Sequence, residues 1–256
     1  MDRHISILAC LGLSLVVAAC GGNSGAGTNA ADTVAVQGAW SGSNSLGNSY
    51  DMLLLENGAL YQVFGTSLAG AFTALGMNQG SYSVSGNTFA ASITQYNPNG
   101  TSATGSLAAS VVANTTINGM AAASGSNAQV GFSSIPTAVA HPGYNYNTPA
   151  QLSDIAGAWP AGFVLGQASP FVFAVDPSSG ALSSSNAGCA ISGAFTPRST
   201  NVFSVSLTLG PAPCTSPAQT YTGVAISYLA SNGKRQLTAA LQTPDKSGGT
   251  ALYAQR

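Results

Sequence analysis

The sequence contains an internal repeat, which constrains the fold more than any other feature. The triplet Gly38-Ala39-Trp40 returns as Gly157-Ala158-Trp159. Further matches follow in the same order: Gly58-Ala59-Leu60 with Gly180-Ala181-Leu182, then Gly80, Asn87, Phe89 and Thr94 with Gly193, Asn201, Phe203 and Thr208, and finally Thr104-Gly105 with Thr222-Gly223. Chance could supply one match in a chain rich in Gly and Ala, whereas four matches in one order indicate a duplication. We therefore expect two homologous lobes.

Within each lobe the hydrophobic pattern has a period of two, which is typical of strands with one buried face. The alternating apolar sets are Phe89, Ala91 and Ile93; Leu107, Ala109 and Val111; Phe203, Val205, Leu207 and Leu209; Val224, Ile226 and Tyr228; and Leu237, Ala239 and Leu241. Asn-Gly pairs at 57–58, 118–119 and 232–233 predict two-residue type I′ hairpin turns. The expected fold class is all-β, with two tandem antiparallel lobes that are each a small meander barrel or a sandwich.

The segment between the lobes is marked by Pro136 and by His141-Pro142-Gly143, which are typical of a linker. We therefore assign residues 36–134 to an N-terminal β lobe, 135–150 to the linker and 151–256 to a C-terminal β lobe.

Two features inside the lobes need an interpretation of their own. In Thr66–Asn78, three large apolar residues have helical spacing, although two glycines weaken a helix, so we expect a short helix or an ordered loop there. Trp40 and Trp159 occupy matching places, and we expect both to be core residues rather than platforms that stack on a ligand.

Composition excludes several classes of protein. Charged residues make up 5% of the chain, against about 25% in an ordinary soluble protein. With 45% hydrophobic residues the chain is too apolar to be disordered. A net charge of −1 gives no electrostatic reason to expect a nucleic-acid partner.

The N-terminus begins with a short polar segment and an apolar run, Ile5 to Val17, that is too short to span a bilayer as a helix. It ends in Val17-Ala18-Ala19-Cys20, which resembles the lipobox of bacterial lipoproteins. The resemblance implies that residues 1–19 are a signal peptide, that Cys20 is lipidated, and that the lipid anchors the chain to a membrane. In lipoproteins an aspartate after the cysteine commonly signals inner-membrane retention; Gly21 stands there instead and favours the outer membrane. Residues 20–35, rich in Gly, Ser and Asn, are expected to be a flexible tether. For the apolar run Ile5 to Val17, the alternative to a signal peptide is a poor transmembrane anchor or a buried helix.

Four cysteines are present. Cys10 would leave with the signal peptide, and Cys20 would carry lipid. Cys189 and Cys214 remain in a chain that the lipobox sends out of the cytoplasm, so we expect them to form a disulfide. A redox or metal-binding role is the alternative, but no C-x-x-C spacing or neighbouring histidine supports it.

Catalytic and metal-binding motifs are scarce. After processing, His141 would be the one remaining histidine, and we expect it to be exposed and inert in its Pro-Gly linker, so a Ser-His-Asp triad lacks support. Neither G-x-S-x-G nor a phosphate-binding G-x-x-x-x-G-K-[ST] occurs. Each carboxylate is interpreted as a solvated loop charge: Asp32, Asp51, Glu56, Asp154, Asp176 and Asp245. We predict no catalytic residues, no metal site and no cofactor, and the protein is not expected to be an enzyme.

We therefore expect a lipid-anchored, non-enzymatic lipoprotein of the outer membrane, with unknown ligand-binding residues. A binding module for a protein or glycan would show an exposed aromatic patch, which Tyr144, Tyr146 and Tyr221 could form. A structural envelope component would show apolar outer faces and no pocket. A small-molecule carrier would have small inward residues and a cavity. An unrecognised hydrolase would need two carboxylates close together.

Overall fold

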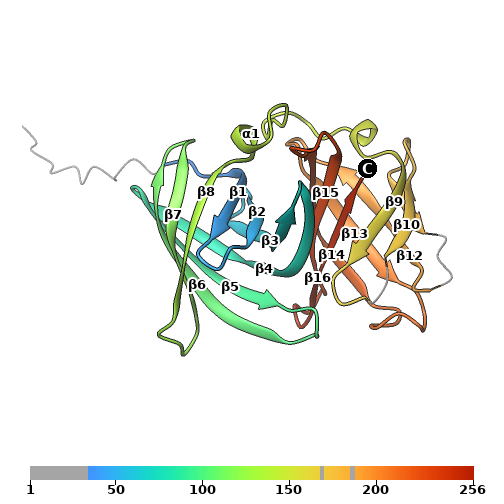
Figure 1. The fold of residues 1–256 in the computed structure, drawn as a ribbon, viewed down its shortest axis with the longest axis horizontal. Coiled ribbons are helices and arrows are strands. Elements are labelled where there is room, and N and C mark those ends of the chain that lie inside the picture. Colours follow the sequence, from blue (N-terminus) through green and yellow to red (C-terminus); the bar gives the residue numbers. More distant parts are fainter. Residues whose placement is uncertain (1–33, 168–169, 185–187) are drawn as a thin grey trace, which may run out of the picture. The chain divides into compact units, whose positions relative to one another are not determined.

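The computed structural model describes residues 34–167, 170–184 and 188–256. Within these ranges the chain is almost entirely β-structure and forms two closed antiparallel barrels of eight strands each (Figure 1). The prediction of two tandem all-β lobes is therefore confirmed, and each lobe is a meander barrel. Cys20, the expected signal peptide and the tether up to residue 33 lie outside the described residues.

The strands of the first barrel pair in chain order, and β8 returns to pair with β1. They are β1 (Gly38–Asn44), β2 (Ser49–Leu54), β3 (Ala59–Leu68), β4 (Ala71–Ser85), β5 (Thr88–Tyr96), β6 (Ser102–Val112), β7 (Thr116–Ala123) and β8 (Gln129–Pro136).

The second barrel has the same connectivity, and β16 pairs with β9 to close it. Its strands are β9 (Gly157–Val164), β10 (Phe171–Val175), β11 (Ala181–Ser184), β12 (Ile191–Pro197), β13 (Phe203–Leu209), β14 (Thr220–Leu229), β15 (Arg235–Gln242) and β16 (Gly249–Gln255).

Two short helical segments lie between the barrels in the chain, α1 (Thr137–Ala140) and the 3₁₀ turn η1 (Leu152–Asp154). No helix in the described part of the chain is long and apolar enough to cross a membrane.

The two tryptophans of the repeat occupy the same place in each barrel. Both are buried, and each donates its indole N–H to the backbone oxygen of the residue four positions earlier, Val36 at 2.9 Å and Ile155 at 2.8 Å. Because this contact ties the segment before the first strand to the tryptophan, each indole closes one end of its barrel. The prediction that Trp40 and Trp159 are core residues is confirmed, and we call this end of each barrel the plug end.

Two glycines of the repeat align the barrels residue by residue. A Cβ on Gly80 would lie 1.9 Å from the backbone oxygen of Ser92, and a Cβ on Gly193 would lie 2.0 Å from that of Ser206. Each position thus requires glycine because a neighbouring strand passes too close for any side chain. Strand β4 therefore corresponds to β12, and β5 to β13.

The last match of the repeat is displaced by two residues. Gly105 pairs with Ile93 on β5, whereas Leu207, the residue equivalent to Ile93, pairs with Tyr221. Gly223 pairs with Val205, two residues further along the strands. The spatial equivalent of Gly105 is therefore Tyr221 rather than Gly223.

The expectation of a helix or loop over Thr66–Asn78 is wrong. These residues continue β3 and β4 through a hairpin whose turn contains Gly70 at φ +77°. The apolar residues with helical spacing do not form one buried face, because Leu68 at the hairpin tip is exposed. Pairing with the neighbouring strand satisfies the backbone here, so side-chain spacing did not decide the structure.

One of the three predicted turns is also wrong. Asn118 and Gly119 lie inside β7, where they pair with Ser110 and Ala109. Glycine is needed at position 119 for close packing, since its Cβ would lie 2.1 Å from the backbone oxygen of Ala108. The actual turn before β7 holds Asn114 at φ +50°.

The other two Asn-Gly pairs do turn the chain, but not as type I′ turns. Positive φ occurs at Gly58 (+78°) and Gly233 (+75°), while neither preceding asparagine has a positive φ. The Gly58 N–H donates to the Leu55 oxygen at 3.0 Å, and the Leu55 N–H donates to the Ala59 oxygen at 2.9 Å. This arrangement is the three-residue hairpin loop with glycine in the left-handed position.

The barrels belong to one compact unit, and apolar side chains on their outer surfaces pack together. The predicted alternation of Val224, Ile226 and Tyr228 is correct, but these residues face the first barrel, while Ala225 faces the interior of the second. Both faces of β14 are therefore buried. The shared cluster also contains Ala39, Leu53, Leu55, Tyr144, Tyr146 and Val202.

The predicted disulfide is present. Cys189 and Cys214 are joined with an S–S distance of 2.00 Å. The bond links the residues before β12 to the connection between β13 and β14. Cys214 is buried and belongs to the core of the second barrel.

Candidate ligand-binding site

The interior of the first barrel is filled at one end and hollow at the other. Fully buried side chains pack around Trp40 at the plug end, among them Met52, Leu54, Leu60 and Phe89. Towards the opposite end, where β1 ends and β2 begins, a cavity of about 320 Å³ remains. We call this the open end. The cavity is at the lower limit of the range of roughly 300–1,000 Å³ that is usual for small-molecule sites.

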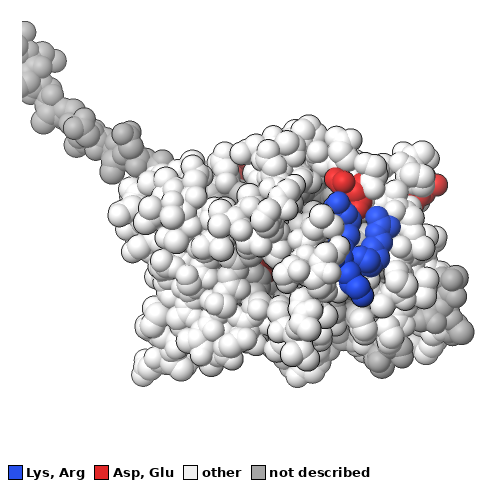
Figure 2. All heavy atoms as spheres, turned by 45° about the horizontal axis from the view of Figure 1, so that its top comes forward, with Lys and Arg blue, Asp and Glu red and all other residues white. Residues whose placement is uncertain are grey.

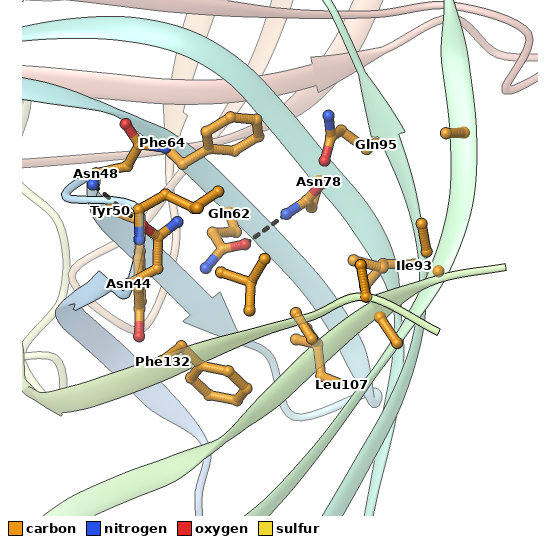
Figure 3. A pocket seen from close by; sticks show the side chains of 18 of the residues that line it. Asn44, Asn48, Tyr50, Gln62, Phe64, Asn78, Ile93, Gln95, Leu107 and Phe132 are labelled. Carbon is orange, nitrogen blue, oxygen red and sulfur yellow. Dashed lines mark hydrogen bonds between the residues drawn. The ribbon is translucent and has the colours of Figure 1, made fainter. Parts of the chain in front are cut away.

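The cavity exists because the inward side chains at this level are small. Gly105, Ala121 and Ala123 line it from β6 and β7. Larger apolar side chains form the remaining walls: Phe64, Ile93, Leu107 and Phe132 (Figure 3). The result is a largely apolar chamber at the open end of the barrel.

Two amide side chains project into this chamber from neighbouring strands (Figure 3). The Nδ2 group of Asn78 on β4 donates to Oε1 of Gln62 on β3 at 2.6 Å. Only 7% of Asn78 and 8% of Gln62 are exposed, and the Asn78 oxygen has no hydrogen-bond partner among the described residues. We call these two residues the amide pair.

Several other polar groups of the lining have partners inside the protein. The Tyr50 hydroxyl donates to the Ser133 backbone oxygen at 2.9 Å and shares a hydrogen bond of 2.7 Å with the Ser134 hydroxyl. Burial raises the pKa of Tyr50 to about 12, so the phenol stays protonated. The side-chain oxygen of Asn44 accepts two backbone N–H groups of its own turn. The side-chain nitrogen of Gln95 donates to the side-chain oxygen of Asn97.

The chamber contains no charged side chain in its lining. Between residues 34 and 136 the sequence has Asp51 and Glu56 as its sole charged residues, and neither lines the chamber. Basic side chains occur further along the chain, and Figure 2 shows several of them gathered beside acidic ones while most of that face is neutral. The lining therefore favours neutral over charged molecules, since an ion would lose its hydration without gaining a counter-charge.

Equivalent positions in the second barrel carry different side chains. Asn78 lies two residues before Gly80 and corresponds to Ile191, which lies two residues before Gly193. Gln95 lies two residues after Ile93 and corresponds to Leu209, which lies two residues after Leu207. Gln62 corresponds to Ser184, whose hydroxyl accepts the Ile191 N–H at 2.7 Å.

The small residues of the first barrel are replaced as well. Tyr221 stands in place of Gly105, and Leu241 stands in place of Ala121. Both are buried in the core of the second barrel. At these two positions the second barrel therefore has larger inward side chains than the first.

The three tyrosines that we expected to form an exposed aromatic patch do not do so. Tyr144, Tyr146 and Tyr221 are 6%, 9% and 7% exposed. The first two pack between the barrels, and Tyr221 lies in the second core. Sequence alone could not show this, because the surface that buries Tyr144 and Tyr146 is made by the outer faces of both barrels.

Asp51 and His141 also differ from the expectation of exposed, inert groups. Asp51 is 8% exposed and accepts hydrogen bonds from the Tyr228 hydroxyl at 2.6 Å and from Ser41 Oγ at 3.1 Å. His141 stacks on the Tyr228 ring with the centroids 4.0 Å apart. Glu56 is exposed in a turn, as expected, and it also accepts a hydrogen bond from the Tyr146 hydroxyl at 2.6 Å.

The environment of Asp51 and His141 stabilises their neutral forms. Burial raises the pKa of Asp51, while the hydrogen bond from Tyr228 acts in the opposite direction. Burial lowers the pKa of His141, because the charged form of an imidazole is the protonated one, and the nearby Asp51 opposes this shift. The Ser41 hydroxyl bonds to the carboxylate directly and not through the imidazole, so the order of a Ser-His-Asp triad is not formed. This cluster joins the barrels.

Elsewhere in the described ranges, no three side chains of the metal-binding types come together. Asp176 and Asp245 lie in turns, where serine hydroxyls donate to their carboxylates. These two residues stay at the surface, in agreement with the sequence interpretation.

The amide pair was missed by the sequence analysis. Gln62 lies between Leu60 and Phe64 in an alternating run, so a polar residue on the inward face was the available signal. Asn78 gave no signal, since its segment was interpreted as a helix or a loop. A comparison with protein-family models and with curated proteins found no match to this sequence.

Proposed function

We propose that this protein is a lipid-anchored carrier that holds a small neutral molecule in its first barrel. The observation that carries the proposal is a largely apolar cavity of about 320 Å³ at the open end of that barrel. Eight-stranded barrels can hold one small ligand when their interior side chains leave room. Anchoring through Cys20 in the outer membrane and the absence of enzymatic activity are parts of the same proposal.

The cavity distinguishes this function from the alternatives. A structural envelope component needs no cavity, and it would be as stable if both barrels were packed through. A protein or glycan receptor would use an exposed aromatic surface, whereas the three candidate tyrosines are buried. A barrel interior that loses packing at one end is more readily explained by a ligand than by either alternative.

Native mass spectrometry of the full-length protein, purified from the membrane of its source cells, tests the proposal. We expect the protein to retain a small molecule of constant mass. The variant Ala121→Leu, which introduces the residue of the second barrel, should lose it because the new side chain occupies the cavity. Ala108→Leu is the matched control, since Ala108 lies on the outer face of β6 and its substitution should leave the bound mass unchanged. Wild-type protein without any bound molecule, even after incubation with a lipid and metabolite extract, would contradict the proposal.

A further inference from the structure

We infer that the ligand of the first barrel presents an amide-type edge, in which a hydrogen-bond donor and an acceptor are adjacent, to the amide pair Gln62 and Asn78. Lactams, ureides and primary or secondary carboxamides have such an edge. The inference rests on the proposed carrier function and specifies which neutral molecules the chamber selects.

The amide pair has hydrogen-bonding groups that its internal bond does not use. A bond between two primary amides uses one donor and one acceptor, so the pair retains groups of both kinds. In the observed arrangement the Asn78 Nδ2–Gln62 Oε1 bond leaves the Asn78 oxygen and the Gln62 nitrogen for other partners. If both amides were rotated by half a turn, the pair would still present one acceptor and one donor. The polarity of the site therefore does not depend on how the two amides are oriented.

The Asn78 side-chain oxygen is buried and has no hydrogen-bond partner in the part of the chain that the structure describes. An acceptor that is buried without a partner costs about as much as a lost hydrogen bond, and such groups are rare in folded proteins. The Asn78 oxygen is such a group, in a side chain that is 7% exposed and directed into the cavity (Figure 3). The oxygen itself is enclosed, so a ligand N–H would satisfy it once the Asn78 amide turns towards the open part of the chamber.

The second barrel has no amide pair at the equivalent positions. There Ile191 has an apolar side chain, and Ser184 bonds to the Ile191 backbone. The free acceptor and donor of the amide pair therefore have no counterpart at the equivalent positions of the second barrel, as expected if the pair serves a ligand of the first barrel.

Three bicyclic probes of similar size test the inference: quinolin-2-one has an adjacent donor and acceptor, coumarin has the acceptor alone, and naphthalene has neither. Isothermal titration calorimetry would be carried out on the full-length protein in lipid nanodiscs, with empty nanodiscs subtracted. We expect quinolin-2-one to bind about 10-fold more tightly than coumarin or naphthalene, because it satisfies both groups of the pair. The double variant Gln62→Leu with Asn78→Ile should lose this preference and retain naphthalene.

The outcomes separate the inference from the function on which it rests. Equal affinity of the wild type for all three probes would overturn the inference and leave the carrier function standing. Binding of none of them would overturn the inference, and the mass-spectrometric result would then decide the carrier function independently. The wild-type comparison requires no variant, so it remains decisive if the double variant does not fold.

Discussion

The two barrels share one plan at the plug end and differ at the other end. Trp40 and Trp159 close the plug ends with the same indole-to-backbone hydrogen bond. At the opposite end, Gly105, Ala121 and Asn78 of the first barrel are replaced by tyrosine, leucine and isoleucine in the second. The plug end is therefore common to both barrels, whereas the inward residues at the other end give the first barrel a chamber and the second larger side chains at three of these positions.

The second barrel also has additional contacts at its plug end. The Arg256 guanidinium lies 4.4 Å from the centre of the Trp159 ring and donates to the Ala156 backbone oxygen at 2.6 Å. Between residues 34 and 136 the sequence has no lysine or arginine, so Trp40 has no such cation within its own barrel. The packed barrel thus holds cation and disulfide contacts, and the hollow barrel holds neither.

The largest expected effect comes from reversing the difference between the barrels at one position. Leu241→Ala should reduce the free energy of unfolding by about 2–5 kcal/mol, because Leu241 is fully buried and its removal leaves a cavity. Ala121→Leu at the equivalent position should cost less than about 1.5 kcal/mol, since the side chain enters existing space. Guanidinium denaturation, followed by tryptophan fluorescence, measures both. Equal losses for the two variants would show that the barrels do not differ in packing at this level.

A smaller effect is expected at the contact between the barrels. Asp51→Ala should cost about 1–3 kcal/mol, because it leaves the Tyr228 hydroxyl and Ser41 without their acceptor. Asp51→Asn retains an acceptor and removes the buried charge. Since burial raises the pKa of Asp51, the wild type loses stability as the pH rises through that raised value, whereas the Asp51→Asn variant has no carboxyl to ionise there.

The stability of Asp51→Asn relative to the wild type should therefore increase from about pH 4, where the carboxyl ionises in the unfolded chain, up to the raised pKa of the folded state. Denaturation at several pH values between 4 and 8 measures this difference. His141→Gln serves as the control, because burial lowers the pKa of His141, and its contribution is lost as the pH falls. A relative stability that does not change with pH would show that Asp51 titrates normally.

The smallest effect is expected for Arg198→Gln. Its guanidinium lies 3.6 Å from the Glu56 carboxylate, and both side chains are partly exposed, 31% and 43% respectively. Exposed ion pairs contribute about 0–1 kcal/mol. The variant should therefore differ from the wild type by less than about 1 kcal/mol, and this difference should disappear in high salt. A loss above about 2 kcal/mol would mean that this pair, and not the apolar cluster, holds the barrels together.

Much of the fold could be predicted from sequence because its signals are local. Period-two alternation, as in Phe203 to Leu209, follows from strand geometry, and the repeated Gly-Ala-Trp triplet follows from duplication. Errors arose where one residue type serves two purposes. Gly119 packs against a neighbouring strand instead of turning the chain, and the paired hairpin over Thr66–Asn78 overrides helical spacing.

The sequence by itself determined the all-β class, the two lobes, the core tryptophans and the pair Cys189–Cys214, because neighbouring residues and residue types carry that information. Only the tertiary structure decided which inward positions meet at one level of a barrel. The cavity depends on Gly105 and Ala121 facing the same space as the amide pair, and the burial of Asp51 and Tyr146 depends on the second barrel. Such contacts arise from the register between strands distant in sequence, and no local pattern encodes that register.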